Sequence, residues 1–188
     1  RVEADIAWPT TSGNGVRVAI VDTGIDLTHP DLASNIKGGV NTISARKSAN
    51  DDNGHGTHVA GTVAALNNSI GVVGVGPSAS LYAVKVLDRN GSGFLSDVIE
   101  GLEWSVGSGM QVVNMSLGTN SDVQSFHDAV IRVNQAGIVQ VAAAGNDGAA
   151  VDFPGAYPEV IAVAAVQKNS NGTLSEASFT SRGSEVDL

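Results

Sequence analysis

Five runs of consecutive apolar residues alternate with segments of helical spacing along this chain of 188 residues, and this alternation constrains the fold more than any other feature. A run that is apolar throughout, rather than at every second residue, is typical of a strand buried on both faces. The runs are residues 16–21, 81–87, 112–117, 138–144 and 160–166, and the helices expected between them span about residues 55–66, 94–107 and 122–136.

Repeated strand–helix–strand order predicts right-handed crossovers and parallel strands. We therefore expect an α/β fold of three layers, in which a doubly wound, mostly parallel sheet has helices on both faces. Such sheets bind ligands beyond the carboxyl ends of their strands. Asp22, Ser116 and Asn146 stand at or just after the ends of three predicted strands, whereas residues 38–53 are expected to form a polar loop.

Composition narrows the classes of partner. The chain carries 10 Lys and Arg residues against 19 Asp and Glu residues, and this net charge of −9 disfavours a nucleic-acid surface. No apolar run reaches the ~18 residues of a membrane span, so no membrane partner is expected. The chain has no cysteine, so disulfides do not stabilise the fold. Its length favours a single domain over residues 1–188.

Asp22 ends the first apolar run and precedes Thr23 and Gly24. A carboxylate held at a strand end can accept a hydrogen bond from an imidazole, which fixes the histidine tautomer and stabilises the imidazolium. The alternative is an aspartate that caps a turn, because isolated Asp-Thr-Gly tripeptides also occur in aspartic proteases and phosphate-binding sheets.

His55 lies between two glycines at the start of a predicted helix of small and apolar residues. A neutral imidazole there can take a proton from a hydroxyl and return it to a leaving amine. The alternatives are a hydrogen-bonded core histidine and a metal ligand, since His58 follows three residues later. Metal ligation is disfavoured, because the helix lacks the Glu of metalloprotease helices and no cysteine cluster accompanies it.

Six segments in order along the chain resemble the subtilisin family of serine endopeptidases. They are VDTGID at 21–26, HPDL at 29–32, NGHGTHVAGT at 53–62, LYAVKVL at 81–87, NMSLG at 114–118 and AAAGN at 142–146. The resemblance implies that Asp22 orients His55, that His55 activates a serine, and that the Asn146 amide donates to the oxyanion. No serine of this chain has the family's Gly-Thr-Ser context. The resemblance therefore places the nucleophile beyond Leu188, on the same polypeptide or on a separate C-terminal fragment.

On this interpretation the peptidase domain of residues 1–188 is incomplete at its C-terminus and also at its N-terminus, and the chain alone is expected to be inactive. The resemblance further implies a polypeptide substrate held as an added strand, a main-chain mode that tolerates many sequences. The implied substrate-binding residues are Gly91, Ser92, Gly93, Ser116, Leu117, Gly118, Ala143 and Gly145, with Leu95, Val98 and Leu117 as candidates for an apolar subsite or for ordinary packing.

Alignment with the family places Asp152 near the base of the primary specificity pocket and Asp147 at its rim. We hypothesise a preference for Lys or Arg before the cleaved bond, with Asp152 the main contributor. The alternative is a pair of solvated surface carboxylates.

A loop at residues 66–72 resembles the family's calcium loop. Calcium binds about 6–8 oxygen ligands, which the resemblance assigns to the Asp31 carboxylate, the Asn68 side chain and the carbonyls of Leu66, Ile70 and Val72. Calcium is therefore the expected cofactor. The family also suggests an extracellular protein, although intracellular relatives keep the other location open.

Two other functions remain from the sequence. The first is an inactive peptide-binding module, or an inert fragment, that keeps the strand-capturing groove without a nucleophile. The second is a nucleotide-binding doubly wound protein, which is disfavoured because no Gly-rich phosphate loop follows the first strand.

Overall fold

The computed structural model describes residues 3–188, which divide into two compact units between Val113 and Asn114. The strands of the first unit are β1 (Arg17–Asp22), β2 (Ile36–Asn41) and β3 (Ser80–Lys85), and its helices are α1 (Ala4–Ala7), α2 (His55–Ala64) and α3 (Leu95–Gly107). Strand β4 (Val112–Met115) spans the boundary. The second unit holds α4 (Gln124–Gln135), β5 (Val139–Ala143), β6 (Ile161–Val163), β7 (Val166–Lys168) and β8 (Leu174–Glu176).

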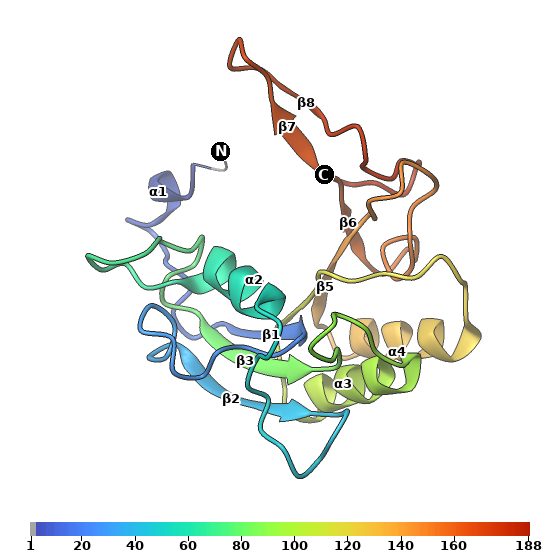
Figure 1. The fold of residues 1–188 in the computed structure, drawn as a ribbon, viewed down its shortest axis with the longest axis horizontal. Helices are drawn as coiled ribbons and strands as arrows, with labels where there is room; N and C mark the ends of the chain where they lie inside the picture. The colour runs from blue at the N-terminus through green and yellow to red at the C-terminus, as the bar shows by residue number, and fades with distance from the viewer. Residues whose placement is uncertain (1–2) are drawn as a thin grey trace. The chain divides into compact units, whose positions relative to one another are not determined.

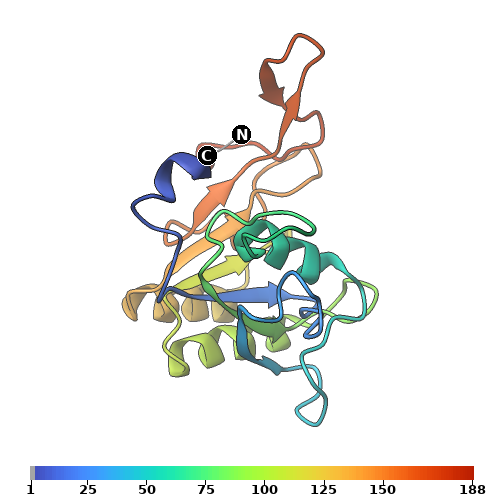
Figure 2. The same ribbon diagram turned by 90° about the vertical axis from the view of Figure 1, so that its left-hand side faces the viewer.

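Six strands form one sheet, in the order β2-β3-β1-β4-β5-β6. Strand β3 pairs parallel with β1 and with β2 in the first unit (Figure 1), and β5 pairs parallel with β6 in the second. In the first unit β3 lies between β1 and β2. Helices α2 and α3 lie on opposite faces of these strands, which gives the expected three layers (Figures 1 and 2). No helix among residues 3–188 is long and apolar enough to cross a membrane.

Strand alternation decides which helix each residue contacts. Ile20 and Ala83 belong to a buried cluster with Ala60 and Ala64 of α2. The next residues along the two strands, including Val84, face α3 instead. There a Cβ on Gly101 would lie 2.8 Å from methyl carbons of Val84 and Val86, so a glycine permits the close approach of α3. The residues of β1 and β3 are therefore apolar on both faces, as the continuous runs predicted.

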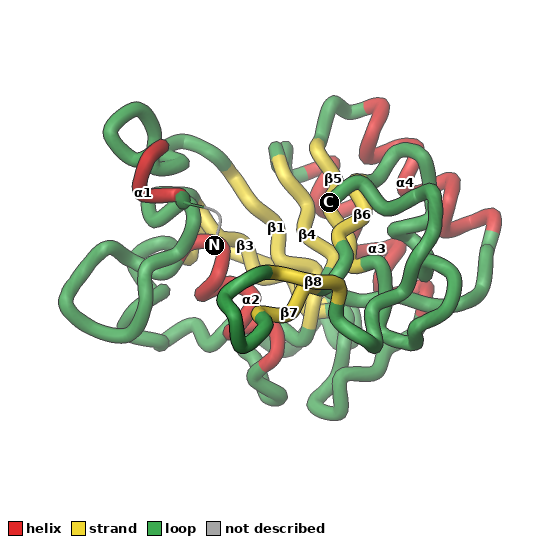
Figure 3. Tube along the Cα trace, turned by 90° about the horizontal axis from the view of Figure 1, so that it is seen from above, coloured by secondary structure: helices red, strands yellow, loops and turns green. Residues whose placement is uncertain are grey.

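The core of the second unit is formed in part by α4, and the segment around Phe153, which follows β5, pairs with the chain at Thr119. Helix α4 buries Phe126, Ala129, Val130 and Val133 at helical spacing against the rest of the unit. Thr119 and Phe153 exchange two backbone hydrogen bonds of 2.8 Å. Strands β7 and β8 pair antiparallel as a short hairpin, seen side by side in Figure 3.

Two sequence expectations need correction. The expected polar loop at 38–53 begins with strand β2, whose Gly38 and Gly39 weaken the sequence signal. Gly39 fits because it approaches the Ala83 carbonyl too closely for a Cβ, whereas a Cβ on Gly38 would make only ordinary contact with the Tyr82 ring. The run 160–166 is not one strand, since β6 ends at Val163 and exposed Val166 begins the hairpin.

Candidate active site

Asp22 and His55 are hydrogen-bonded at the carboxyl end of β1. Nδ1 of His55 lies 2.7 Å from Oδ1 and 2.9 Å from Oδ2 of Asp22. The carboxylate is fully buried, whereas the His55 side chain is 50% exposed. Because a carboxylate only accepts, Nδ1 carries the shared proton, and in the neutral imidazole Nε2 is then an acceptor. This is the arrangement of a histidine that can take a proton from a hydroxyl group.

The start of α2 is built by side chains rather than by a regular cap. The His55 N–H donates to Oδ1 of Asn53, the Gly56 N–H donates to Oγ1 of Thr23, and the Thr57 N–H donates to Oδ2 of Asp51. These are among the N–H groups that a helix leaves without intrahelical partners. His55 is therefore fixed by the same hydrogen bonds that begin its helix.

Asp51 is the centre of this arrangement. Its carboxylate accepts hydrogen bonds from the hydroxyls of Thr23 and Thr57 and from the backbone N–H groups of Asn53, Gly54 and Thr57. Partial burial raises the pKa of Asp51, but these hydrogen bonds together outweigh it and hold the pKa below its ordinary value. The carboxylate thereby links the turn after Asp22 to the helix that carries His55.

Two glycines permit the close approach of these segments. Gly24 has a φ of 103°, and a Cβ there would overlap the Ala49 carbonyl. A Cβ on Gly56 would overlap the Gly24 carbonyl and lie 3.1 Å from Oδ1 of Asp22. Close packing of the backbone therefore explains why these two motifs carry glycine at positions 24 and 56, independently of any catalytic role.

The second unit carries Asn146 and Asp152. Asn146 is exposed, and within residues 3–188 its side chain makes no recorded hydrogen bond. The preceding Gly145 has a φ of 109°, and a Cβ there would collide with the Asp152 carboxylate and lie 2.8 Å from Oγ of Ser181. A Cβ on Gly118 would lie 3.0 Å from the Cβ of Asp152. Asp152 thus lies between Gly118 and Gly145, two of the predicted substrate-binding residues.

Burial, and secondarily the charge of Asp147, raise the pKa of Asp152. Its segment is held by aromatic packing: the Phe153 and Tyr157 ring centroids are 4.8 Å apart, and the His127 ring stacks on Tyr157 at 4.0 Å. The Tyr157 hydroxyl donates to Oδ1 of Asp122, and burial together with this bond raises its pKa to about 12. Asp152 is consequently a half-buried carboxylate, next in sequence to this aromatic packing, whose surroundings disfavour its charge.

The other predicted substrate-binding residues differ in availability. In the first unit the Ser92 N–H donates to Oδ1 of Asp88 and its carbonyl accepts from the Asp88 N–H, so the backbone of Ser92 is already used within a turn. Val98 is 5% exposed and is core packing, whereas Leu95 is half-buried. In the second unit Ser116, Leu117 and Ala143 are half-buried, and Gly118 is exposed.

Asp31 organises the predicted calcium loop. Its buried carboxylate accepts from Nδ2 of Asn68 at 2.8 Å and from the Val72 N–H at 3.0 Å. The Leu66 carbonyl accepts from the Asn68 N–H, whereas no hydrogen bond to the carbonyls of Ile70 or Val72 is recorded among residues 3–188. Oxygen ligands of this kind fit a hard cation such as Ca²⁺.

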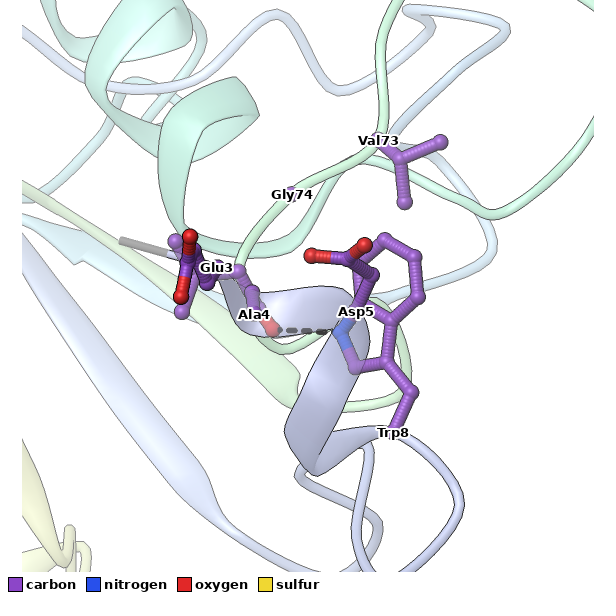
Figure 4. Close-up of a pocket in the computed structure, with 7 residues that line it drawn as sticks. Glu3, Ala4, Asp5, Trp8, Val73 and Gly74 are labelled. Carbon is purple, nitrogen blue, oxygen red and sulfur yellow. Dashed lines mark hydrogen bonds between the residues drawn. The ribbon is translucent and has the colours of Figure 1, made fainter. Parts of the chain in front are cut away.

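A cavity of about 350 Å³ lies between α1 and residues 73–75, near this loop (Figure 4). Nε1 of Trp8 donates to the Val75 carbonyl at 2.9 Å at this place, and Glu3 and Asp5 also line the cavity. The sequence interpretation did not single out these residues. No group of three or more His, Cys, Asp or Glu side chains suited to a metal is found in the described part of the chain.

Comparison with known proteins identifies the family of this chain. Residues 13–188 match the model of the subtilase family, and the chain belongs to that family. It is 55% identical over 177 residues to a thermostable alkaline protease of Halalkalibacterium halodurans. It is also 50% identical over 178 residues to subtilisin Savinase of Lederbergia lenta and 50% identical over 183 residues to subtilisin J of Geobacillus stearothermophilus. Each match covers 94% of this chain.

The chain spans 47%, 64% and 46% of the lengths of these three relatives. Family membership accordingly confirms the predicted resemblance and fold class.

Proposed function

We propose that the protein is a serine endopeptidase of the subtilisin type. The observation that carries the proposal is the 2.7 Å bond between Nδ1 of His55 and buried Asp22, with Nε2 left to accept a proton. His55 takes the proton of a serine hydroxyl as that oxygen attacks a peptide carbonyl. It then gives the proton to the leaving amine, while Asp22 stabilises the imidazolium.

The nucleophile and the oxyanion complete the proposal. The serine is supplied by a segment after Leu188 or by a separate C-terminal fragment. The exposed amide of Asn146 donates to the oxyanion in the tetrahedral intermediate, a contact worth a few kcal/mol in the transition state. Its lack of a recorded partner among the described residues supports this role, because no internal bond has to break first.

A fluorophosphonate probe tests the proposal directly, because it labels only a serine activated by a neighbouring base. The full-length protein is expected to be labelled and to cleave a denatured protein substrate. His55→Ala is expected to abolish both, and the chain of residues 1–188 alone is expected to do neither. Tight binding of peptides by the full-length protein, without labelling or turnover, would instead favour a peptide-binding module.

We further propose that Asp152 gives the enzyme a preference for Lys or Arg before the cleaved bond. Its position against Gly118 and Gly145 supports the assignment. Its raised pKa supports it as well, because a carboxylate in unfavourable surroundings gains more from a cationic partner.

Calcium is the proposed cofactor, held by Asp31, Asn68 and the carbonyls of Leu66, Ile70 and Val72. When bound, the ion would supply charge neutralisation and rigidity rather than chemistry. Chelation is expected to lower the melting temperature of the full-length protein, and Asp31→Asn is expected to remove that dependence. An unchanged melting temperature on chelation would refute the site.

An extracellular location is proposed from the same family relationship.

A further inference from the structure

Lys85 is a buried charged residue that the chemistry of Asp22 and His55 does not use. It ends β3 and is 5% exposed. In the parallel register of β1 and β3, Lys85 is the partner of Asp22. Paired residues of neighbouring strands project to the same face, and neighbouring strands lie about 4.8 Å apart. Lys85 therefore stands beside Asp22 on the face of the sheet that α2 covers.

All three protons of the Lys85 ammonium have acceptors. Nζ donates to the Thr23 carbonyl at 2.6 Å, to Oδ1 of Asp52 at 2.6 Å and to the Leu87 carbonyl at 2.9 Å. Three acceptors match the three donors of a protonated lysine, whereas a neutral amine offers only two. The bond to the Thr23 carbonyl is buried, whereas the bonds to the Leu87 carbonyl and to Asp52, whose side chain is 56% exposed, are partly buried.

Together with backbone hydrogen bonds, the bonds of Lys85 fix the backbone around Asp22. The Asp22 carbonyl accepts from the N–H groups of Val86 and Leu87, at 2.9 and 3.2 Å. Lys85 holds the next carbonyl, that of Thr23, and also the Leu87 carbonyl of the turn that supplies those N–H groups. The bond to Asp52 also attaches Lys85 to the loop three residues before His55. One ammonium thus connects the segment after Asp22, the end of β3 and the loop that leads into α2.

We propose that Lys85 is a positioning residue for the Asp22–His55 pair. It fixes the backbone on the C-terminal side of Asp22 and anchors the loop before His55, so that the carboxylate stays aimed at Nδ1. This inference rests on the proposed endopeptidase function. The three hydrogen bonds of Lys85 do not include the His55 imidazole, and it acts through the placement of Asp22.

Lys85→Met in the full-length protein tests the proposal, because methionine keeps the length of the side chain without its donors. We expect kcat to fall about 10–100-fold, the size of effect that follows a small misplacement of reacting groups, with KM unchanged. Lys47→Met, which removes an exposed lysine, is the matched control and should leave kcat unchanged. Asp52→Asn keeps both carbonyl bonds and should cost at most about fivefold in kcat, as for a pair with one exposed partner.

The proton that His55 shares with Asp22 supplies a readout that does not require activity. It is expected to give a low-field proton resonance in the full-length protein, which Lys85→Met should shift or broaden and Lys47→Met should not. Absence of peptidase activity and probe labelling in the wild type would refute the proposed function, and the resonance would still test the role of Lys85. A folded Lys85→Met variant with wild-type kcat and an unmoved resonance would overturn the inference.

Lys85→Arg decides the matter if Lys85→Met does not fold. Arginine keeps the charge, but its planar fork cannot present donors to the same three acceptors in one geometry. A reduced kcat with unchanged KM and a shifted resonance supports positioning by Lys85. Wild-type values for both would overturn it.

Discussion

The Asp22–His55 region and the Asn146–Asp152 region are built in opposite ways. Around Asp22, the carboxylates of Asp22 and Asp51 and the ammonium of Lys85 all have partners inside the first unit, and the Asp51 carboxylate alone accepts five hydrogen bonds. In the second unit Asn146 has no recorded partner in the described part of the chain, and the pKa of Asp152 is raised by burial. The first region is organised in advance, whereas on the proposed function the second holds groups that a substrate would satisfy.

The largest expected effect follows from disturbing the organised region. Asp22→Asn replaces an acceptor by an amide that can force the wrong histidine tautomer. We expect kcat to fall by about 10⁴-fold, as is typical of such triads. Steady-state kinetics of the full-length protein measures this loss, and circular dichroism at the assay temperature checks the fold. A loss of less than tenfold would mean that Asp22 does not orient His55.

Asn146→Ala tests the other region and should have the second largest effect. We expect kcat to fall by about 10²–10³-fold, the range found when one oxyanion donor is removed from a subtilisin. The melting temperature should not change, because the side chain is exposed and breaks no recorded bond. A clear loss of stability would show that Asn146 is part of the structure rather than a waiting donor.

Asp152→Asn should change specificity more than rate. The ratio of kcat/KM for paired Lys and Phe substrates is expected to fall about tenfold at neutral pH. Because the pKa of Asp152 lies above its ordinary 3.8, the wild-type preference should decline as the pH falls through that raised value. The Asn variant should show no such pH dependence. An unchanged ratio at neutral pH would leave Asp152 as an ordinary surface carboxylate.

The smallest expected effect is on the stability of the fold, and the charges of Asp51 and Asp152 change that stability in opposite directions. The lowered pKa of Asp51 stabilises the fold above pH 3.8, and this contribution is lost as the pH falls through the lowered value. The raised pKa of Asp152 acts in the opposite direction, because its charge destabilises the folded state once the pH exceeds 3.8. Asp51→Asn should therefore lower the melting temperature at pH 7 by a few degrees. Asp152→Asn should leave it unchanged or raise it.

Sequence patterns anticipated the elements whose signal is local. The apolar runs gave β1, β3, β4 and β5, and helical spacing gave α2, α3 and α4 to within about two residues at most ends. Strand β2 was missed because Gly38 and Gly39 carry no apolar pattern, and only the position of the Ala83 carbonyl in three dimensions explains Gly39. The pairing of Asp22 with His55 agrees with the strand-end argument.

The supporting residues could not be anticipated in the same way. Asp51 and Lys85 both act through hydrogen bonds to Thr23, which is distant from them in the sequence. Asp51 accepts from the Thr23 hydroxyl, 28 positions away, and Lys85 donates to the Thr23 carbonyl, 62 positions away. A polar run before His55 and a lysine at the end of an apolar strand were the only signals. Both have an ordinary interpretation as a loop and as a strand end.

The length of the loop before α2 has a consequence for how this chain can vary. Asp51 bonds to the N–H groups of residues 53, 54 and 57, so an insertion or deletion between Asp51 and His55 would break several hydrogen bonds at once. Residues 45–48 are exposed instead, just before buried Ala49. Natural or engineered length changes should therefore accumulate at 45–48, where a graft could be added while the spacing from Asp51 to His55 stays constant.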